Sequence, residues 1–536
     1  MRQLTAGNLL KQSNVLAQVG AYGRTPLRLS QGFPARLWRS LSICLTAFIV
    51  LVACSSPASN VETHSALSTP DPRFGVVETY HAPDQATQAG VGWTRLIFYW
   101  SELERTGPDD WNAFHEPLDR IDAEIKGGRE VVGMLQHTPA WATDGQPDIG
   151  VPRGLYLPVD DPGNLWAGFV RKVVKTYQGR ITRWIIWNEP DIAPDVYGTQ
   201  WAGTPADYYQ LVKVAWLAAH EADPNVKIHL GGLTYWHDQA YLSKFLAAAQ
   251  ADPTAASHGD YFDVVSAHIY FKPETTETIL GSIRDAMHKA NIDKPIWINE
   301  TNAPPFDDPT HPWINPVFPD TQSMQAAFLM QEFALGLVDG AQRIAVYKWI
   351  DQPPPQPGFD PYGLLRENGD PRPALAAFQV ITRTYAGATS ARDAETEKIH
   401  AVTLVRGSQT TRVLWSRLDD SVIVAVPALA GSAQVFDQTG AVREARPLLG
   451  RYILTLGPAT CPQGFGCYIG GPPLALLEGA ADRPAGEVIA LTRTTLLRAG
   501  IGAGVCVLIG LALIIVLRRR SQGLNLKQGN HEVGSS

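Results

Sequence analysis

The sequence predicts an α/β fold, a (β/α)8 or TIM barrel, followed by a small antiparallel β domain. Three observations support this prediction. Between Arg73 and Gly387, eight short apolar runs typical of buried strands alternate with amphipathic helical stretches. Continuous buried strands that alternate with helices indicate a parallel sheet covered by helices. After Gly387, short β-type runs follow one another between turn residues, which is the pattern of an antiparallel domain.

The barrel is expected to occupy residues 73–387, because eight strand–helix units are the number that closes a barrel. A doubly wound parallel sheet is the structural alternative. In the helical stretch 165–177, apolar residues recur on one face: Leu165, Phe169, Val173 and Tyr177. The expected strands are Phe74–Val77, Thr94–Tyr99, Glu130–Leu135, Arg183–Trp187, Lys227–Gly231, Phe262–Ile269, Pro295–Asn299 and Ile344–Trp349.

The second domain is expected over residues 388–480 as a small β-sandwich-like unit, and residues 481–498 are expected to be a linker. Its expected strands are His400–Val405, Arg412–Trp415, Val422–Val426, Ala433–Phe436 and Tyr452–Leu456. Cys461 and Cys467 bracket a short loop, CPQGFGC. Outside the cytoplasm such a pair is typical of a disulfide, and a zinc site would need further ligands nearby.

The first 54 residues carry the pattern of a lipoprotein-type secretory signal. Arg36 and Arg39 precede an apolar run, Leu41–Ala53, that is short for a membrane span but suits a signal sequence. The run ends in "LVAC", which resembles the bacterial lipobox and predicts lipidation of Cys54. The alternative is a signal that happens to end in cysteine. Residues 55–72 are rich in Ser, Thr, Pro and Ala and are expected to be a flexible tether.

A second membrane anchor is expected near the other end of the chain. Ala499–Leu517 is 19 residues long without a charge, and Arg518–Arg520 follows directly. This length spans a bilayer, and the basic flank favours a cytoplasmic tail over residues 518–536. The protein is therefore expected in the cell membrane, with the catalytic domain extracellular.

The composition limits the class of protein. The chain has 536 residues, a formal net charge of −7, 18% charged and 45% hydrophobic residues, which is a globular composition. The slightly acidic balance provides no basic surface for nucleic acid, so no nucleic-acid partner is expected. Fifteen Trp residues are compatible with stacking on sugar rings, although Trp also fills protein cores.

Two glutamates follow predicted buried strands directly. Glu189 follows the fourth strand in "RWIIWNEPD", and Glu300 follows the seventh in "KPIWINETN". In a barrel, functional groups lie at the carboxyl ends of the strands, and strands four and seven face each other across the mouth. Glycoside hydrolysis needs two such carboxylates, one as proton donor and one as nucleophile or base. Either glutamate alone could equally be a capping or salt-bridged residue.

On these motifs the sequence resembles the clan A glycoside hydrolases, retaining (β/α)8 enzymes that include families 39 and 5. The resemblance covers roughly residues 73–385, and "WNEPD" is its most specific motif. It implies that Glu189 is the acid/base and Glu300 the nucleophile. Family 39 usually has "NEPN" where this chain has "NEPD", so the resemblance is to the clan rather than to one family.

The resemblance also implies substrate-binding roles around the two glutamates. Arg95 would keep the nucleophile ionised, Asn188 would bind the sugar 2-hydroxyl, and Tyr270 would hydrogen-bond the nucleophile. The remaining implied substrate-binding residues are His137, Trp141, His268 and Trp349, the last as a platform under the sugar. Each of these side chains could instead be structural: a core histidine, a packed tryptophan or a buried ion pair.

The predicted function is therefore a membrane-anchored extracellular retaining glycosidase acting on a β-linked poly- or oligosaccharide. A two-carboxylate mechanism needs no metal and no cofactor. Two alternatives stay open: a transglycosylase on the same scaffold, and a catalytically silent carbohydrate-binding envelope protein. The intact glutamate pair argues against the silent protein, and product analysis would separate hydrolysis from transglycosylation.

Overall fold

The structure is a computed structural model that describes residues 69–193, 198–311, 316–352, 361–480 and 486–491. The predicted lipidation site Cys54 and the predicted membrane helix Ala499–Leu517 lie outside these residues. Within the described ranges, no helix combines the length and the hydropathy needed to cross a bilayer. Both anchors therefore remain predictions.

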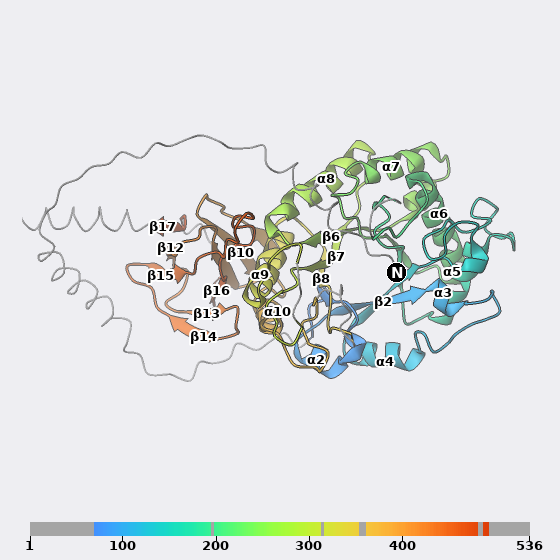
Figure 1. Ribbon diagram of the computed structural model, residues 1–536. Helices are drawn as coiled ribbons and strands as arrows, with labels where there is room; N and C mark the ends of the chain where they lie inside the picture. Colours follow the sequence, from blue (N-terminus) through green and yellow to red (C-terminus); the bar gives the residue numbers. More distant parts are fainter. Residues whose placement is uncertain (1–68, 194–197, 312–315, 353–360, 481–485, 492–536) are drawn as a thin grey trace, which may run out of the picture. The chain divides into compact units, whose positions relative to one another are not determined.

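Eight parallel strands form one sheet in the order β5-β4-β3-β2-β1-β8-β7-β6, and helices surround this sheet (Figure 1). Parallel bridges from His229 to Val264 and from Leu233 to Ala267 join β5 to β6, so the two ends of the sheet meet as in a barrel. The strands are β1 (Phe74–Val76), β2 (Trp93–Tyr99), β3 (Glu130–Gln136), β4 (Arg183–Ile186), β5 (Lys227–Leu230), β6 (Val265–Tyr270), β7 (Ile296–Asn302) and β8 (Arg343–Val346).

Helices follow each barrel strand, as expected for (β/α) units. Their buried faces pack on the sheet in one apolar core, and α6 begins with a capping box between Thr204 and Asp207. The helices are α2 (Pro83–Gln88), α3 (Trp100–Leu103), α4 (Leu118–Lys126), α5 (Leu165–Thr176), α6 (Pro205–Ala222), α7 (Tyr241–Ala251), α8 (Thr276–Lys289), α9 (Gln322–Val338) and α10 (Pro373–Thr384). Short 3-10 turns lie between some of them.

A separate apolar cluster fills the interior of the barrel. Trp93 and Trp297 are fully buried there, with ring centroids 5.1 Å apart. Gly75 of β1 must lack a side chain, because a Cβ would lie 2.3 Å from the Trp93 ring. The guanidinium groups of Arg183 and Arg343, from the start of β4 and β8, lie over the Trp297 ring at 5.2 and 4.4 Å. The amino-terminal end of the barrel is thus packed with side chains, which leaves the opposite end for chemistry.

The β domain contains a six-stranded sheet in the order β14-β13-β16-β11-β10-β9 and a three-stranded sheet in the order β15-β12-β17. Side chains of both sheets share one apolar core, as in a sandwich. The strands are β9 (Ser390–Arg392), β10 (Ile399–Arg406), β11 (Gln409–Ser416), β12 (Val422–Pro427), β13 (Ala433–Asp437), β14 (Val442–Ala445), β15 (Arg451–Leu456), β16 (Leu474–Glu478) and β17 (Ile489–Leu491).

Four of these strands were not predicted: β9, β14, β16 and β17. Strand β17 lies within the range predicted as a linker, and it pairs with β12 at Ala490 and Val424. A three-residue strand leaves too short a pattern for sequence reasoning to separate from a linker. The β domain therefore continues beyond residue 480.

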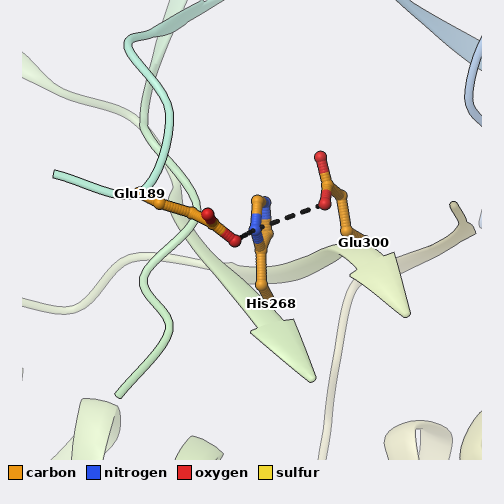
Figure 2. Close-up of side chains that lie close together, drawn as sticks. All are labelled: Glu189, His268 and Glu300. Carbon is orange, nitrogen blue, oxygen red and sulfur yellow. Dashed lines mark hydrogen bonds and ion pairs between the residues drawn. The ribbon is translucent and has the colours of Figure 1, made fainter. Parts of the chain in front are cut away.

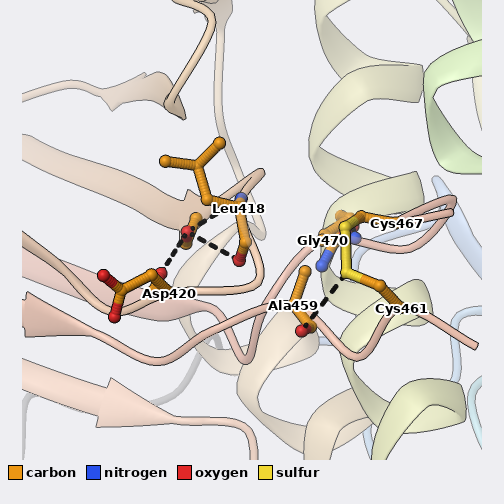
Figure 3. Close-up of a disulfide and its surroundings, with 8 residues drawn as sticks. Leu418, Asp420, Ala459, Cys461, Cys467 and Gly470 are labelled. Carbon is orange, nitrogen blue, oxygen red and sulfur yellow. Dashed lines mark hydrogen bonds between the residues drawn. A yellow bond between two sulfur atoms is a disulfide. The ribbon is translucent and has the colours of Figure 1, made fainter. Parts of the chain in front are cut away.

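Cys461 and Cys467 form a disulfide that closes the loop between β15 and β16 (Figure 3). The flanking chain is held by backbone hydrogen bonds from Ala459 N–H to the Leu418 carbonyl (2.7 Å) and from Gly471 N–H to the Ser416 carbonyl (2.7 Å). The loop is thereby fixed at both ends against the β10–β12 region.

Candidate active site

Four strands bring the predicted chemical groups to the carboxyl end of the barrel. Glu189 follows β4, and Trp187 and Glu189 have φ angles of 71° and 40°. Side chains other than glycine seldom adopt this region, and such backbone conformations occur mainly where packing imposes them. The turn directs Glu189 toward His268, which lies on β6.

A β-bulge in β7 positions Glu300. Ile298 pairs with Ala267 of β6, but the next pair is Glu300 with His268, so Asn299 is an extra residue on β7. The bulge places the Glu300 carboxylate beside His268. The predicted strand ended at Asn299, whereas β7 continues to Asn302.

Figure 2 shows the His268 imidazole between the two carboxylates. Its Nδ1 lies 2.7 Å from Glu189 Oε1 and 3.4 Å from Glu300 Oε2. One carboxylate oxygen of Glu189 and one of Glu300 lie within 4.8 Å of each other. The ring has room only because Gly232 lacks a side chain: a Cβ there would lie 1.9 Å from His268 Nε2.

The Glu300 carboxylate is almost fully buried and has three partners that favour its anion. Arg95 of β2 donates from Nη2 to Glu300 Oε1, and the Tyr270 hydroxyl donates to Oε2 at 2.5 Å. Burial alone would raise the pKa of Glu300, but Arg95, His268 and Tyr270 outweigh it and hold the pKa below its ordinary value. The pKa of Tyr270 is raised well above its usual range by burial and by Glu300, so its hydroxyl stays a donor.

The surroundings of His268 favour the protonated form of its imidazole. Burial alone would lower the pKa of its imidazole, but the Glu300 charge and the hydrogen bond with Glu189 raise it above the ordinary value. The Glu189 side chain is more exposed than that of Glu300, at 21% against 7%. The two carboxylates thus lie in different environments, which separates their roles.

Three further predicted residues line the same end of the barrel. His137 directly follows β3, and its ring centroid lies 4.6 Å from that of Tyr99; burial lowers the pKa of His137. Asn188 precedes Glu189, and its Oδ1 is buried with no hydrogen-bond partner among the described residues. Trp141 is half-buried, and its indole N–H donates to the Glu104 carbonyl at 2.7 Å.

Trp349 differs from its prediction as a sugar platform. Its side chain is fully buried, and its indole N–H donates to the Ala82 carbonyl at 3.2 Å. The predicted strand ran to Trp349, but β8 ends at Val346. Tyr347, the next residue, is half-buried, and burial together with the Glu300 charge raises the pKa of its hydroxyl. Tyr347 is therefore the aromatic residue after β8 that lies within electrostatic reach of Glu300.

The role of Asp191 was also not predicted from the sequence, although this residue belongs to the "WNEPD" motif. Its carboxylate is 2% exposed and accepts hydrogen bonds from the Thr234 N–H (2.9 and 3.1 Å), the Thr234 hydroxyl (2.8 Å) and the Tyr235 N–H (3.0 Å). Burial, with a contribution from Glu189, raises the pKa of Asp191. Asp191 thus ties the turn that carries Glu189 to the loop after β5.

Glu189, His268 and Glu300 do not favour a metal ion, although two carboxylates and an imidazole are possible metal ligands. Arg95 already bonds to Glu300 and carries a full positive charge at the same site. A divalent cation would be repelled by this guanidinium. The arrangement instead suits acid–base and nucleophilic chemistry by two carboxyl groups.

The part of the chain that carries the candidate active site is similar to known glycoside hydrolases. Residues 162–378 match the family profile described as "Glycosyl hydrolase catalytic core", a range that contains Glu189, His268 and Glu300. No curated protein matches the chain. The match confirms the prediction that the chain is a glycosidase. Together with the fold shared with a family 39 glycoside hydrolase, it supports the resemblance to clan A.

Solved structures share the fold at low sequence identity. A family 39 glycoside hydrolase from Bacteroides cellulosilyticus is 16% identical with a TM-score of 0.58, over 76% of this chain and 81% of that one. A glucosidase from Croceicoccus marinus is 12% identical with a TM-score of 0.51, over 77% and 97%. A family 30 endoxylanase from Clostridium papyrosolvens is 12% identical with a TM-score of 0.51, over 78% and 98%.

Proposed function

We propose that this glycosidase retains anomeric configuration, with Glu300 as the nucleophile and Glu189 as the acid/base. The observation that carries the proposal is the approach of the two carboxylate oxygens to within 4.8 Å across His268. Retaining enzymes hold their carboxyl groups about 5–5.5 Å apart, whereas inverting enzymes leave about 6.5–9.5 Å for a water molecule. The short separation favours direct attack by a carboxylate.

In the first step, a Glu300 oxygen attacks the anomeric carbon while Glu189 gives its proton to the departing glycosidic oxygen. The glycosidic bond breaks, and an ester bond joins the sugar to Glu300. Arg95 and Tyr270 keep Glu300 ionised before the attack, because both donate to its oxygens. In the second step, water gives a proton to Glu189 and attacks the same carbon, which frees Glu300.

His268 coordinates the two steps through its Nδ1. When Glu189 has given up its proton, an N–H at Nδ1 stabilises the new carboxylate over a distance of 2.7 Å. The same nitrogen lies 3.4 Å from Glu300, so the positive charge of a protonated ring favours both anions. This role requires the ring to stay where Gly232 allows it to pack.

The substrate class we propose is a β-linked poly- or oligosaccharide. An endoxylanase with the same fold supports a polysaccharide, since its substrate is a polymer. We also propose that the barrel lies outside the cell, anchored by lipid on Cys54 and by the segment Ala499–Leu517. The disulfide between Cys461 and Cys467 supports this location, because disulfides persist in oxidising compartments.

The anomeric configuration of the first product tests the proposed mechanism. Time-resolved NMR of an aryl glycoside or an oligosaccharide during hydrolysis reports that configuration before it equilibrates in water. We expect the configuration of the substrate. An inverted first product would contradict the assignment of Glu300 as a nucleophile and require a water molecule between the carboxylates.

A further inference from the structure

An exposed aromatic ring stands at the tip of the disulfide loop. Phe465 lies inside the loop closed by Cys461 and Cys467, and it is 44% exposed. Gly464 and Gly466 on either side have φ angles of 85° and 70°, which residues with a side chain rarely adopt. The backbone therefore holds the Phe465 ring outward on a short, cross-linked turn.

The loop is fixed to the barrel side of the molecule by buried polar contacts. The Tyr468 hydroxyl donates to Asp320 at 2.5 Å, and Asp320 is fully buried. The Gln331 side chain of α9 accepts from Gly470 N–H at 3.0 Å and donates to the Gly471 carbonyl at 3.1 Å. These buried contacts keep the loop in one position relative to the barrel.

A continuous series of rings joins this loop to the candidate active site. The Phe465 ring lies 5.7 Å from Phe318, and Phe318 stacks on Phe271 at 4.6 Å. The Phe271 ring lies 5.9 Å from that of Tyr270, whose hydroxyl bonds to Glu300. The exposed ring is thus the outer end of an aromatic path that begins at the proposed nucleophile.

The chemistry of this path suits a carbohydrate chain. The faces of sugar rings carry C–H groups that pack on aromatic rings, while their hydroxyls remain in water. Phe318 is half-buried and has the Lys272 ammonium 5.6 Å from its centroid, which adds a donor beside the apolar surface. Phe465 keeps nearly half of its surface in solvent at the outer end of this series of rings, where a sugar ring can reach it.

We propose that Phe465 of the β domain, together with Phe318 and Lys272 of the barrel, forms a remote sugar-binding subsite. Its ligand is a set of neutral sugar units. They belong to the same glycan chain whose glycosidic bond is cleaved at the site formed by Glu189 and Glu300. This inference rests on the proposed function, and it adds that the disulfide loop recognises substrate length. Short substrates that end near the cleaved bond do not reach it.

The test compares Phe465→Ala with Phe114→Ala, a control that removes another exposed ring (89% exposed) from the loop before α4. Both variants and the parent protein are assayed on aryl glycosides and on xylo-, cello- and manno-oligosaccharides of increasing length. Loss of one aromatic contact corresponds to a decrease in kcat/KM of roughly 2- to 12-fold. We expect this decrease for long substrates with Phe465→Ala only, through KM, and none for aryl glycosides.

A second arm measures binding without turnover. Affinity electrophoresis in gels containing xylan, glucan or mannan should show weaker retention of Phe465→Ala than of Phe114→Ala. Replacing both Cys461 and Cys467 with Ser should give the same length-dependent loss, because the ring is no longer held outward. Equal losses on all substrates, no loss on any, or a change in oligomeric state with Phe465→Ala would overturn the subsite. If the parent protein cleaves nothing, the proposed function fails, and the gel arm still decides whether Phe465 binds glycan.

Discussion

Replacing Tyr270 with Phe removes a single hydroxyl from the site and leaves the ring. That hydroxyl donates to Glu300 Oε2 at 2.5 Å and is one of three groups that stabilise the Glu300 anion. A hydrogen bond to a charged group contributes about 1.5–3 kcal/mol. Since one pH unit corresponds to about 1.4 kcal/mol, the change moves the acid limb of activity by about one to two pH units.

The direction in which the acid limb moves depends on which protonation form of Glu300 is active. Glu300 must be ionised to attack, and the Tyr270 hydroxyl favours the ionised form, so its loss raises the pKa of Glu300. Activity is then lost at a higher pH as the solution is acidified. We expect the acid limb of the kcat/KM profile of Tyr270→Phe to lie at higher pH than that of the parent protein, with the alkaline limb little changed.

The control is Tyr177→Phe, which removes a buried hydroxyl that donates to the Glu116 carbonyl at 2.7 Å, away from the carboxylates. This variant should lose some stability, measured as a lower Tm, without any displacement of the pH profile. An acid limb of Tyr270→Phe that stays in place, or that moves to lower pH, would refute the role of Tyr270 in holding Glu300 ionised.

Three further outcomes are expected. Glu189→Ala should lose about 10²–10⁴-fold in activity on substrates with poor leaving groups. Azide should restore its turnover of activated substrates and give a glycosyl azide of retained configuration, whereas azide should not rescue Glu300→Ala in this way. Rescue of Glu300→Ala with retention would reverse the roles of the two glutamates. Asp191→Asn should lower the free energy of unfolding by about 1–3 kcal/mol in urea titrations, because an amide nitrogen would face N–H donors, and an unchanged stability would argue against its tie to Thr234. Cys54→Ala should abolish lipid labelling, and protease added to intact cells should release the barrel; a protected barrel would contradict the proposed orientation.

The sequence predicted the barrel well because buried parallel strands and amphipathic helices leave long, distinct patterns. All eight predicted strands overlap observed ones, and the two glutamates lie together as the strand positions required. The β domain was predicted less completely. Strand β16 is central in its sheet, yet "LALLE" follows a Gly/Pro-rich stretch and is too short to show a period.

The misplacement of Trp349 and the omission of Tyr347 share one physical cause. The apolar pattern of residues 344–349 continues past the point where β8 ends at Val346. The sequence does not show where a chain leaves a sheet, since that depends on hydrogen bonds with distant residues. Here Tyr347 N–H still bonds to the Thr301 carbonyl of β7 at 3.1 Å, whereas Lys348 N–H bonds to the Tyr362 carbonyl at 3.4 Å. The hydrogen bonds of Asp191 join it to residues more than forty positions further along the chain. A local sequence pattern does not reveal such distant partners.

The extra residue in β7 determines which way the Glu300 side chain faces. Trp297 points into the barrel and Ile298 points toward the helices, so strict alternation would turn Glu300 outward as well. Asn299 is accommodated as a bulge, which reverses this phase, so the proposed nucleophile faces the mouth of the barrel. If β7 paired Asn299 as an ordinary strand residue instead of as a bulge, the Glu300 charge would face the helices although the sequence was unchanged. Transplanting this site onto another barrel therefore requires copying the irregularity of the strand together with its residues.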